Sequence, residues 1–334
     1  MTGVTIRYQK IKGNNQSHRH MNEVSNEKLQ RVINLFIDKD KYDVAKLLGI
    51  EVDTVRRYLA LAKERDMAPE VEGIKLPRIF VFDLENAPSK AAVWRMWKQN
   101  IYNDQITEEW YMLSWSGKWM FDTEIYSDVL TPEEAIKGDD KRIMESLWKY
   151  IDFADILIGH NINQFDVKKM NTRFVVHDLM PPSPYQTIDT LDAAKRNFSF
   201  TSNKLDYLCK QFGVARKADN GGMARWLGCC EGNPNDLMEM EKYNKQDIIA
   251  TEELYQAMRP YIKSHPNLAL YMDSSTDLCY KCGSSEIEWI DRFYYTNVNK
   301  YSVYRCKSCN SLGRSRQTAV SKEDGKHITS PVAR

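Results

Sequence analysis

The segment RIFVFDLEN (residues 78–86) ends in two carboxylic acids, Asp83 and Glu85. Residues 79–82, which precede Asp83, are apolar and β-branched or aromatic, which is typical of a strand in the interior of a sheet. Residues i and i+2 of a strand point to the same face, so both carboxylates are expected side by side near the end of that sheet. Because two like charges repel when they are this close, the pair predicts a divalent cation. The alternative is a strand that leaves the sheet for solvent at Asp83.

Two more acids occupy positions where an α/β domain gathers functional groups. Asp166 follows the apolar run DILIGHN, which ends at Asn161, and is expected at the start of a helix near a strand end. Tyr243 and Asp247 are four residues apart in a helical pattern and therefore share a face. Glu85, Asp166 and Asp247 are separated by 81 residues each. Each interval is long enough for the chain to return to one end of a sheet.

The elements that must position these acids alternate along the chain. The expected strands are RIFVFDL, WYMLSW, KWMFDTEIY, DILIGHN and YQTIDTL, and the expected helices cover residues 132–151, 165–177, 203–214 and 236–258. Strands first, followed by β-α alternation, predict an α/β domain with a mixed sheet flanked by helices.

The segments DLE, NINQFD and YNKQD fit the pattern D-x-E, N-x3-F-D and Y-x3-D. In this order and spacing they resemble the three motifs of the DEDD superfamily of 3′–5′ exonucleases, whose domain has the ribonuclease H-like fold. The histidine branch would carry His where this chain has Lys242, so the chain resembles the tyrosine (DEDDy) branch. A second resemblance covers most of residues 78–316 and rests on the segments WRMWKQNIYNDQI, LSWSGKWM, PPSPYQTIDTLDAAKRNFSFTSNKLDYL and MEKYNKQD. These segments are similar to exonuclease-like proteins of tailed bacteriophages, which often carry a C-terminal zinc ribbon.

The resemblance implies a phosphodiesterase that removes nucleotides from the 3′ end of DNA with two divalent metal ions. Oxygen ligands favour Mg²⁺ or Mn²⁺ over zinc. Asp83 would bridge the two ions, Glu85 and Asp247 would complete one site, and Asp166 would hold the other largely through water.

Other side chains are candidates for orienting or contacting roles, and the role of Tyr243 is the one that the resemblance implies. Tyr243 would orient the attacking water, as a hydrogen-bond donor more than as a base, because a phenol has a pKa of about 10. Asn161 would orient Asp166 or the substrate sugar. Asp189 could support the metal site or cap a turn, and Lys204 could touch phosphate or be an ordinary exposed lysine. Three tryptophans are candidates either for stacking on a terminal base or for the core: Trp94, Trp97 and Trp115.

Residues 27–66 resemble a helix-turn-helix element. Ala45, Gly49 and Val55 are spaced four and six residues apart. A small Ala lets two helices cross closely, Gly permits the turn, and Val fills the core between the helices.

The last helix of this element is expected to start near Thr54, with Asp53 as its N-cap. It would expose Arg56 and Arg57, and in such modules that helix lies in the major groove or along phosphates. The alternative is a helical hairpin that packs on a neighbour or binds protein.

Four cysteines near the C-terminus form two C-x2-C pairs, Cys279 with Cys282 and Cys306 with Cys309, separated by 23 residues. This spacing predicts a zinc ribbon whose four thiolates hold one structural zinc ion, with a β-hairpin between the pairs. A pair of disulfides is the alternative. Basic and aromatic side chains of the ribbon could grip a nucleic-acid strand or dock a protein: Arg292, Tyr294, Tyr295, Arg305, Arg314 and Arg316.

The bulk composition is that of a globular protein of two or three units: 334 residues, 42% hydrophobic and 28% charged. The net charge of +1 divides into +3 for residues 1–75, −6 for 76–276 and +4 for 277–334. This suits a metal-dependent acidic centre between phosphate-binding appendages. Seven cysteines, an odd number, and no long apolar run predict a cytoplasmic protein, in the host cell if phage-encoded, without membrane contact. The three cysteines outside the ribbon show no metal spacing: Cys209, Cys229 and Cys230.

The expected domains are a flexible tail (1–26), the helix-turn-helix (27–66), the ribonuclease H-like domain (77–265), the zinc ribbon (277–317) and a second flexible tail (318–334). The expected partners are single-stranded DNA or 3′ ends, with RNA and a replication or recombination protein also open. Two other functions remain open at this point. One is a related endonuclease or RNA-processing nuclease, and the other is a catalytically silent DNA-binding regulator or scaffold.

Overall fold

A computed structural model describes residues 25–35, 44–45, 48, 50–65, 70–71, 74–98, 100–120, 122–215, 221–272, 274–330 and 332. These residues divide into two compact units, within residues 1–73 and 74–334. The predicted N-terminal tail lies outside the described residues except for its last two, and the second of these, Asn26, begins the first helix.

The N-terminal unit contains helices α1 (Asn26–Leu35) and α3 (Val52–Glu64) and the short strand β1 (Glu70–Val71). Ala45 and Val55 are buried in one apolar cluster, as their predicted packing roles require. Gly49 lies outside the described residues, so the complete helix-turn-helix stays a prediction.

The start of α3 differs from the prediction. The helix begins at Val52 with Glu51 at the N-cap position, two residues before the expected Thr54. The backbone carbonyl of Glu51 accepts from the N–H groups of Thr54 (2.9 Å) and Val55 (3.2 Å), so helical hydrogen bonding starts there. Glu51 makes no side-chain cap.

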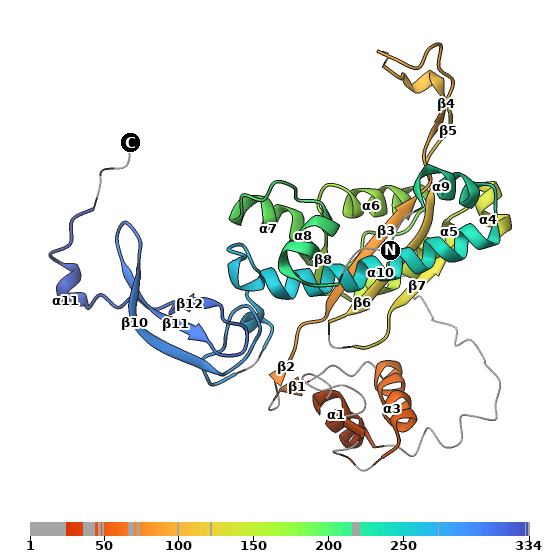
Figure 1. The fold of residues 1–334 in the computed structure, drawn as a ribbon. Helices are drawn as coiled ribbons and strands as arrows, with labels where there is room; N and C mark the ends of the chain where they lie inside the picture. Colours follow the sequence, from red (N-terminus) through yellow and green to blue (C-terminus); the bar gives the residue numbers. More distant parts are fainter. Residues whose placement is uncertain are drawn as a thin grey trace, which may run out of the picture. The chain divides into compact units, whose positions relative to one another are not determined.

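The second unit is built on a five-stranded sheet with the order β7-β6-β3-β8-β9 (Figure 1). The central strand β3 pairs antiparallel with β6 and parallel with β8, and β8 in turn pairs parallel with β9. The predicted mixed sheet is therefore confirmed. Its strands are β3 (Ile79–Asn86), β6 (Met112–Trp119), β7 (Tyr126–Val129), β8 (Ile156–Gly159) and β9 (Gln186–Asp189).

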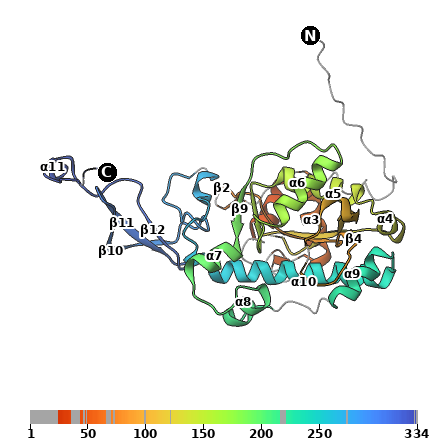
Figure 2. The ribbon, with the colours of Figure 1, turned by 90° about the horizontal axis from the view of Figure 1, so that it is seen from above.

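Helices cover both faces of this sheet (Figure 2). One face lies against α5 (Lys141–Phe153) and α6 (Asp166–Val176), and the other lies against the long helix α10 (Pro234–Met258). Side chains of β3 alternate between the two cores: Phe80, Phe82 and Leu84 join one, Ile79 and Val81 the other. The same alternation turns Asp83 and Glu85 toward the α10 face, because residues i and i+2 share a face.

Two predicted elements have different bounds in the structure. Strand β6 continues to Trp119, which pairs with Phe80, so the expected strand over 118–126 is wrong and β7 starts only at Tyr126. A Cβ at Gly117 would lie 2.1 Å from the Phe80 ring. The glycine therefore makes room for a core side chain and does not end the strand.

The predicted helix 132–151 is two helices, α4 (Pro132–Lys137) and α5. Gly138 ends α4 in the left-handed region, at φ +65°. A glycine adopts this conformation without steric cost, so the chain can turn between the two helices.

Several elements were not foreseen in the sequence. These are the short strands β2 (Ile74–Lys75), β4 (Lys90–Ala91) and β5 (Ile106–Glu108), helices α7 (Thr190–Asn197) and α9 (Gly222–Cys230), and the 3-10 turns η2 (Asn103–Gln105), η3 (Arg259–Tyr261) and η4 (Leu268–Leu270). The predicted helix 203–214 is α8 (Leu205–Phe212). None of the helices in the described part of the chain is both long and apolar enough to span a bilayer.

The C-terminal segment forms a three-stranded antiparallel sheet of β10 (Ile287–Tyr295), β11 (Lys300–Cys306) and β12 (Leu312–Arg314), which confirms the predicted hairpin. The segment after residue 317, expected as a tail, contains the short helix α11 (Lys322–Gly325). The Thr318 hydroxyl donates to Asn299 Oδ1 (3.0 Å) at the hairpin turn, so the start of this segment is hydrogen-bonded to the ribbon.

A buried ion pair joins α6 to the sheet. Asp140 is fully buried and accepts two hydrogen bonds from Arg173 (2.6 and 2.5 Å) and one from the backbone N–H of Met112 (2.7 Å). His177 Nε2 lies 2.5 Å from the same carboxylate. Because Met112 begins β6, this carboxylate fixes the helix that starts at Asp166 relative to a strand beside β3.

Replacing Arg173 with Met should therefore lower the free energy of unfolding by about 3–5 kcal/mol, because the charge of Asp140 would stay buried without its main partner. Urea unfolding followed by circular dichroism measures this. Arg142→Met is the matched control, since Arg142 pairs with Asp128 and Glu134 with 45% of its side chain exposed and should cost no more than about 1 kcal/mol. Equal losses in the two variants would contradict the interpretation.

Candidate functional site

Three carboxylates from two elements converge at the end of the central strand. Asp83 and Glu85 of β3 and Asp247 of α10 each offer an oxygen, and these atoms all lie within 4.8 Å of one another. Asp247 is only 2% exposed, while Asp83 and Glu85 are half-buried. The cluster is therefore anchored on its helix side and accessible on its strand side.

The fourth predicted acid lies beside this cluster. Asp166 is the first residue of α6, is 1% exposed, and accepts a hydrogen bond from the backbone N–H of Leu84 (3.2 Å). Burial and then the negative charge of Asp83 raise the pKa of Asp166 well above its ordinary value. Asp166 is thus bonded to the β3 backbone between Asp83 and Glu85, although it is outside the group of three.

The donor set fits a hard divalent cation. Asp83, Glu85 and Asp247 supply only carboxylate oxygen, which suits Mg²⁺ or Mn²⁺ better than zinc. A cation between them would also offset the repulsion of three like charges.

Asn244 is a further member of the site that the sequence analysis did not single out. It is fully buried, and its Nδ2 donates to Asp83 Oδ2 (2.7 Å). Asn244 precedes Asp247 by three residues on α10, so both side chains face the sheet. The spacing of Asn244 and Asp247 within YNKQD could have indicated that they share a helix face. The partner of Asn244, Asp83, could not be inferred in this way, because it lies 161 residues away in the sequence.

Tyr243 lies on α10 as predicted, with 3% of its surface exposed. Its ring packs edge-on against Trp226 of α9, with ring centroids 6.2 Å apart. The helix α9, absent from the predicted elements, therefore helps to fix the position of this tyrosine.

Asp189 holds the turn that follows β8. Its carboxylate accepts from the N–H groups of Asn161 (3.0 Å) and Asn163 (3.2 Å), and it also caps α7. Of the two predicted roles, capping a turn is the one found. Asn161 adopts a φ of +71°, and its carbonyl accepts from the N–H of Phe165 (3.0 Å), so its backbone shapes the path to Asp166.

The remaining candidates lie in different surroundings. Trp115 is 2% exposed and belongs to the core, whereas Trp94 and Trp97 are 95% and 78% exposed. Lys204 is exposed just before α8, and Arg56 and Arg57 are exposed on α3 of the N-terminal unit.

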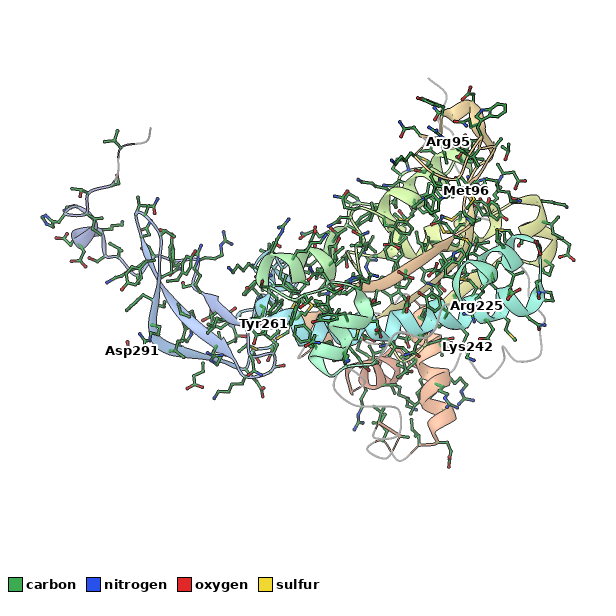
Figure 3. The ribbon with its side chains drawn as sticks, turned by 45° about the horizontal axis from the view of Figure 1, so that its top comes forward. Arg95, Met96, Arg225, Lys242, Tyr261 and Asp291 are labelled. Atoms are coloured by element: carbon green, nitrogen blue, oxygen red, sulfur yellow. The ribbon has the colours of Figure 1, made fainter. Side chains whose placement is uncertain are left out.

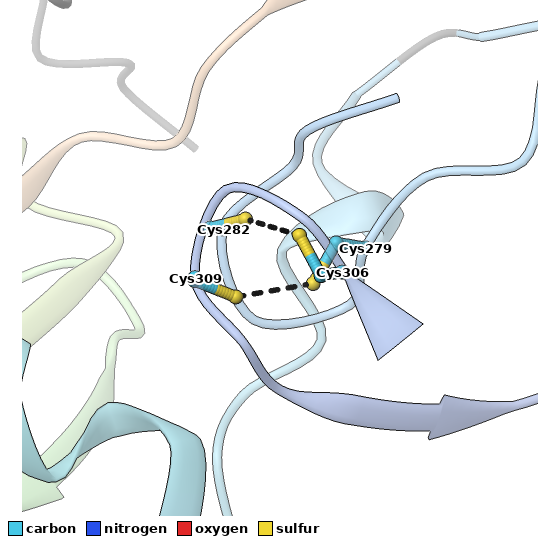
Figure 4. Close-up of side chains that lie close together, drawn as sticks. All are labelled: Cys279, Cys282, Cys306 and Cys309. Carbon is cyan, nitrogen blue, oxygen red and sulfur yellow. Dashed lines mark hydrogen bonds between the residues drawn. The ribbon is translucent and has the colours of Figure 1, made fainter. Parts of the chain in front are cut away.

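The four cysteines of the ribbon meet in one group, with their sulfur atoms facing one another (Figure 4). The Sγ atoms of Cys279 and Cys309 are 3.6 Å apart, as are those of Cys282 and Cys306. Zn–S bonds of ~2.3 Å in a tetrahedron place sulfur atoms ~3.8 Å apart, whereas a disulfide needs ~2.0 Å. The group therefore fits a zinc ion and not a pair of disulfides.

Lys281, between the first two cysteines, connects the ribbon to the end of helix α10 of the sheet domain. It is 2% exposed, and its ammonium group donates to the carbonyls of Arg259 (3.0 Å) and Pro260 (2.9 Å) at the end of α10. The cysteine loop thus supplies the last carbonyls of this helical segment with a cation.

Residues 122–259 match the RNase_H superfamily. Asp166, Tyr243 and Asp247 lie within the matched segment, whereas Asp83 and Glu85 precede it. The segment and the sheet define a ribonuclease H-like domain, which supports a nuclease.

Among solved structures, the family B DNA polymerase from the hyperthermophilic archaeon Pyrobaculum calidifontis is similar over 56% of this chain, with 14% identity and a TM-score of 0.38. The similar region covers only 26% of the polymerase chain. No curated protein matches the chain.

The cysteine group should hold one zinc ion per chain in the purified protein, measured by inductively coupled plasma mass spectrometry. Cys306→Ser should lose that zinc, because three thiolates bind it far more weakly than four. Cys230→Ser is the control, since Cys230 lies outside the group and should leave the zinc content unchanged. Zinc retained in full by Cys306→Ser would exclude this site.

Proposed function

We propose that the protein is a metal-dependent 3′–5′ exonuclease that hydrolyses the phosphodiester bonds of DNA. The observation that carries the proposal is the convergence of Asp83, Glu85 and Asp247 within 4.8 Å at the end of β3, with Asp166 bonded to the same strand. The match of residues 122–259 to the RNase_H superfamily supports the nuclease class.

In this proposal Asp83, Glu85, Asp166 and Asp247 hold two Mg²⁺ or Mn²⁺ ions. Such a pair, when bound, activates a water molecule and stabilises the leaving 3′ oxygen. Tyr243 orients that water by hydrogen bonding. The left-handed backbone at Asn161 holds the turn that leads into α6.

The two appendages add affinity for the nucleic acid. Arg56 and Arg57 on α3 are exposed and basic, as phosphate contacts require. On the ribbon, the guanidinium carbon of Arg314 lies 4.0 Å from the ring centroid of Tyr301 and 5.5 Å from that of Tyr294. The ribbon therefore places a positive charge against aromatic rings. Both contributions predict binding that weakens as salt increases.

Asp83→Ala should lower the rate of hydrolysis at least about 1,000-fold, because one of the carboxylates that would hold the metal ions is removed. The measurement is the shortening of 5′-labelled single- and double-stranded DNA in Mg²⁺ or Mn²⁺. Glu145→Gln, an exposed acid on α5, is the matched control and should keep wild-type activity.

A ladder that shortens from the 3′ end, absent with EDTA and in Asp83→Ala, would support the exonuclease. Cleavage of a closed circular substrate would instead indicate an endonuclease, and cleavage of RNA alone an RNA-processing enzyme. Intact substrates with wild type in both metals, together with retained DNA binding, would favour a silent binding protein.

Asn244→Ala should weaken Mn²⁺ binding by about 10–100-fold, because Asp83 would lose the hydrogen bond that orients its carboxylate. Isothermal titration calorimetry measures this without any substrate. Asn235→Ala, exposed in the first turn of the same helix, is the control. An unchanged Mn²⁺ affinity in Asn244→Ala would remove Asn244 from the site.

A further inference from the structure

The hairpin of β4 and β5 (residues 90–108) projects away from the five-stranded sheet (Figure 1). Its connecting loop presents large apolar side chains to solvent, and Arg95 and Met96 belong to this loop (Figure 3). The exposed fractions are 49% for Val93, 95% for Trp94, 83% for Met96, 78% for Trp97, 53% for Ile101 and 67% for Tyr102. A concentration of apolar and aromatic surface of this kind marks an interaction site.

The base of this loop is held in a defined conformation. Gln105 Nε2 donates to the carbonyl of Ala92 (3.0 Å), and Gln105 Oε1 accepts from the N–H of Tyr102 (2.9 Å). Lys90 and Glu108 form an ion pair across the strands (2.7 Å). The tryptophans are therefore displayed from a braced hairpin, so their exposure is a feature of the fold.

The charge of the loop favours an anionic partner. Residues 92–102 contain Arg95 and Lys98 and no acidic residue, although residues 76–276 as a whole carry a net charge of −6. Aromatic rings alternating with basic groups match a chain that alternates bases with phosphates. The position also fits, because Lys90 follows Glu85 of the carboxylate cluster by only five residues.

We propose that the loop of the β4–β5 hairpin binds single-stranded nucleic acid, with Trp94 and Trp97 stacking on bases and Arg95 and Lys98 contacting phosphates. The proposal rests on the proposed nuclease function and names its substrate form: an unpaired strand that passes from the carboxylate cluster along the hairpin. Each base has a π-face, so the contact is independent of sequence.

The test measures binding of the full-length protein to a 5′-fluorescein 20-mer of thymidylate by fluorescence anisotropy, in buffer without Mg²⁺ or Mn²⁺ and without chelator, so that hydrolysis is prevented and zinc in the ribbon is retained. Trp94→Ala/Trp97→Ala should weaken binding by about tenfold or more. Trp94→Leu/Trp97→Leu should weaken it similarly, because leucine keeps apolar area but cannot stack. Met180→Ala, 75% exposed elsewhere in the same unit, is the control.

An abasic 20-mer of equal charge separates stacking from charge. Wild type and both double variants should bind this oligomer equally, since it offers no bases. Leucine variants that bind thymidylate like wild type, or alanine variants that lose abasic binding to the same extent, would overturn the proposal. The proposal would also be overturned if the tryptophans were needed for sedimentation with anionic phospholipid vesicles but not for binding of thymidylate.

The outcome is separable from that of the proposed hydrolysis. Normal hydrolysis that depends on Asp83, together with thymidylate binding unaffected by the tryptophans, would overturn the hairpin proposal alone. Tryptophan-dependent thymidylate binding without any metal-dependent cleavage would overturn the nuclease and leave the hairpin as a binding surface.

Discussion

The main physical constraint on the second unit is that its fold must hold several like charges close together. Asp83, Glu85 and Asp247 bring ligand oxygens within 4.8 Å of one another, and each such pair repels by on the order of 3 kcal/mol at an effective dielectric constant of 20. Asp166 adds a fourth acid, buried and with a raised pKa. No local preference of the chain would assemble this group, so the surrounding fold must impose it, and a cation would remove most of its cost.

The imposed geometry comes from β3 and α10. Strand β3 is central in the sheet, and its apolar residues enter the cores on both faces before Asp83. Across from Asp83 and Glu85, strand β6 offers Ser116 and Ser114, whose small side chains leave space for the helix. Asn244 then joins helix and strand through Asp83. Burial of apolar surface in the two cores stabilises the fold by about 25 cal/mol per Å², and this free energy holds the acids in place.

The ribbon and the β4–β5 hairpin, which lie outside the five-stranded sheet, depend on other interactions than the carboxylate cluster. The cysteine group fits a zinc ion, which can replace the core that so short a ribbon lacks. Among its described residues, the β4–β5 loop contributes to no metal-ligand group and to neither apolar core, and Trp94 and Trp97 lie in solvent. Lys281 joins the cysteine loop to the end of α10 through two backbone carbonyls. Carboxylates, thiolates and aromatic rings thus occupy separate places in the second unit.

Features that follow from local periodicity could be predicted from the amino-acid sequence. Asp83 and Glu85 share a strand face, Asp166 starts a helix, and Tyr243 and Asp247 lie on one later helix. The two C-x2-C pairs fit one zinc ion. Features that depend on contacts between distant segments emerge only in the folded chain. Asn244 belongs to the site because it donates a hydrogen bond to Asp83. The absence of a side chain at Gly117 leaves space for the Phe80 ring, and the Asp189 carboxylate accepts a hydrogen bond from the turn after β8. Exposure likewise separated Trp94 and Trp97 from Trp115, because a side chain's surroundings are set by the packing of the whole chain.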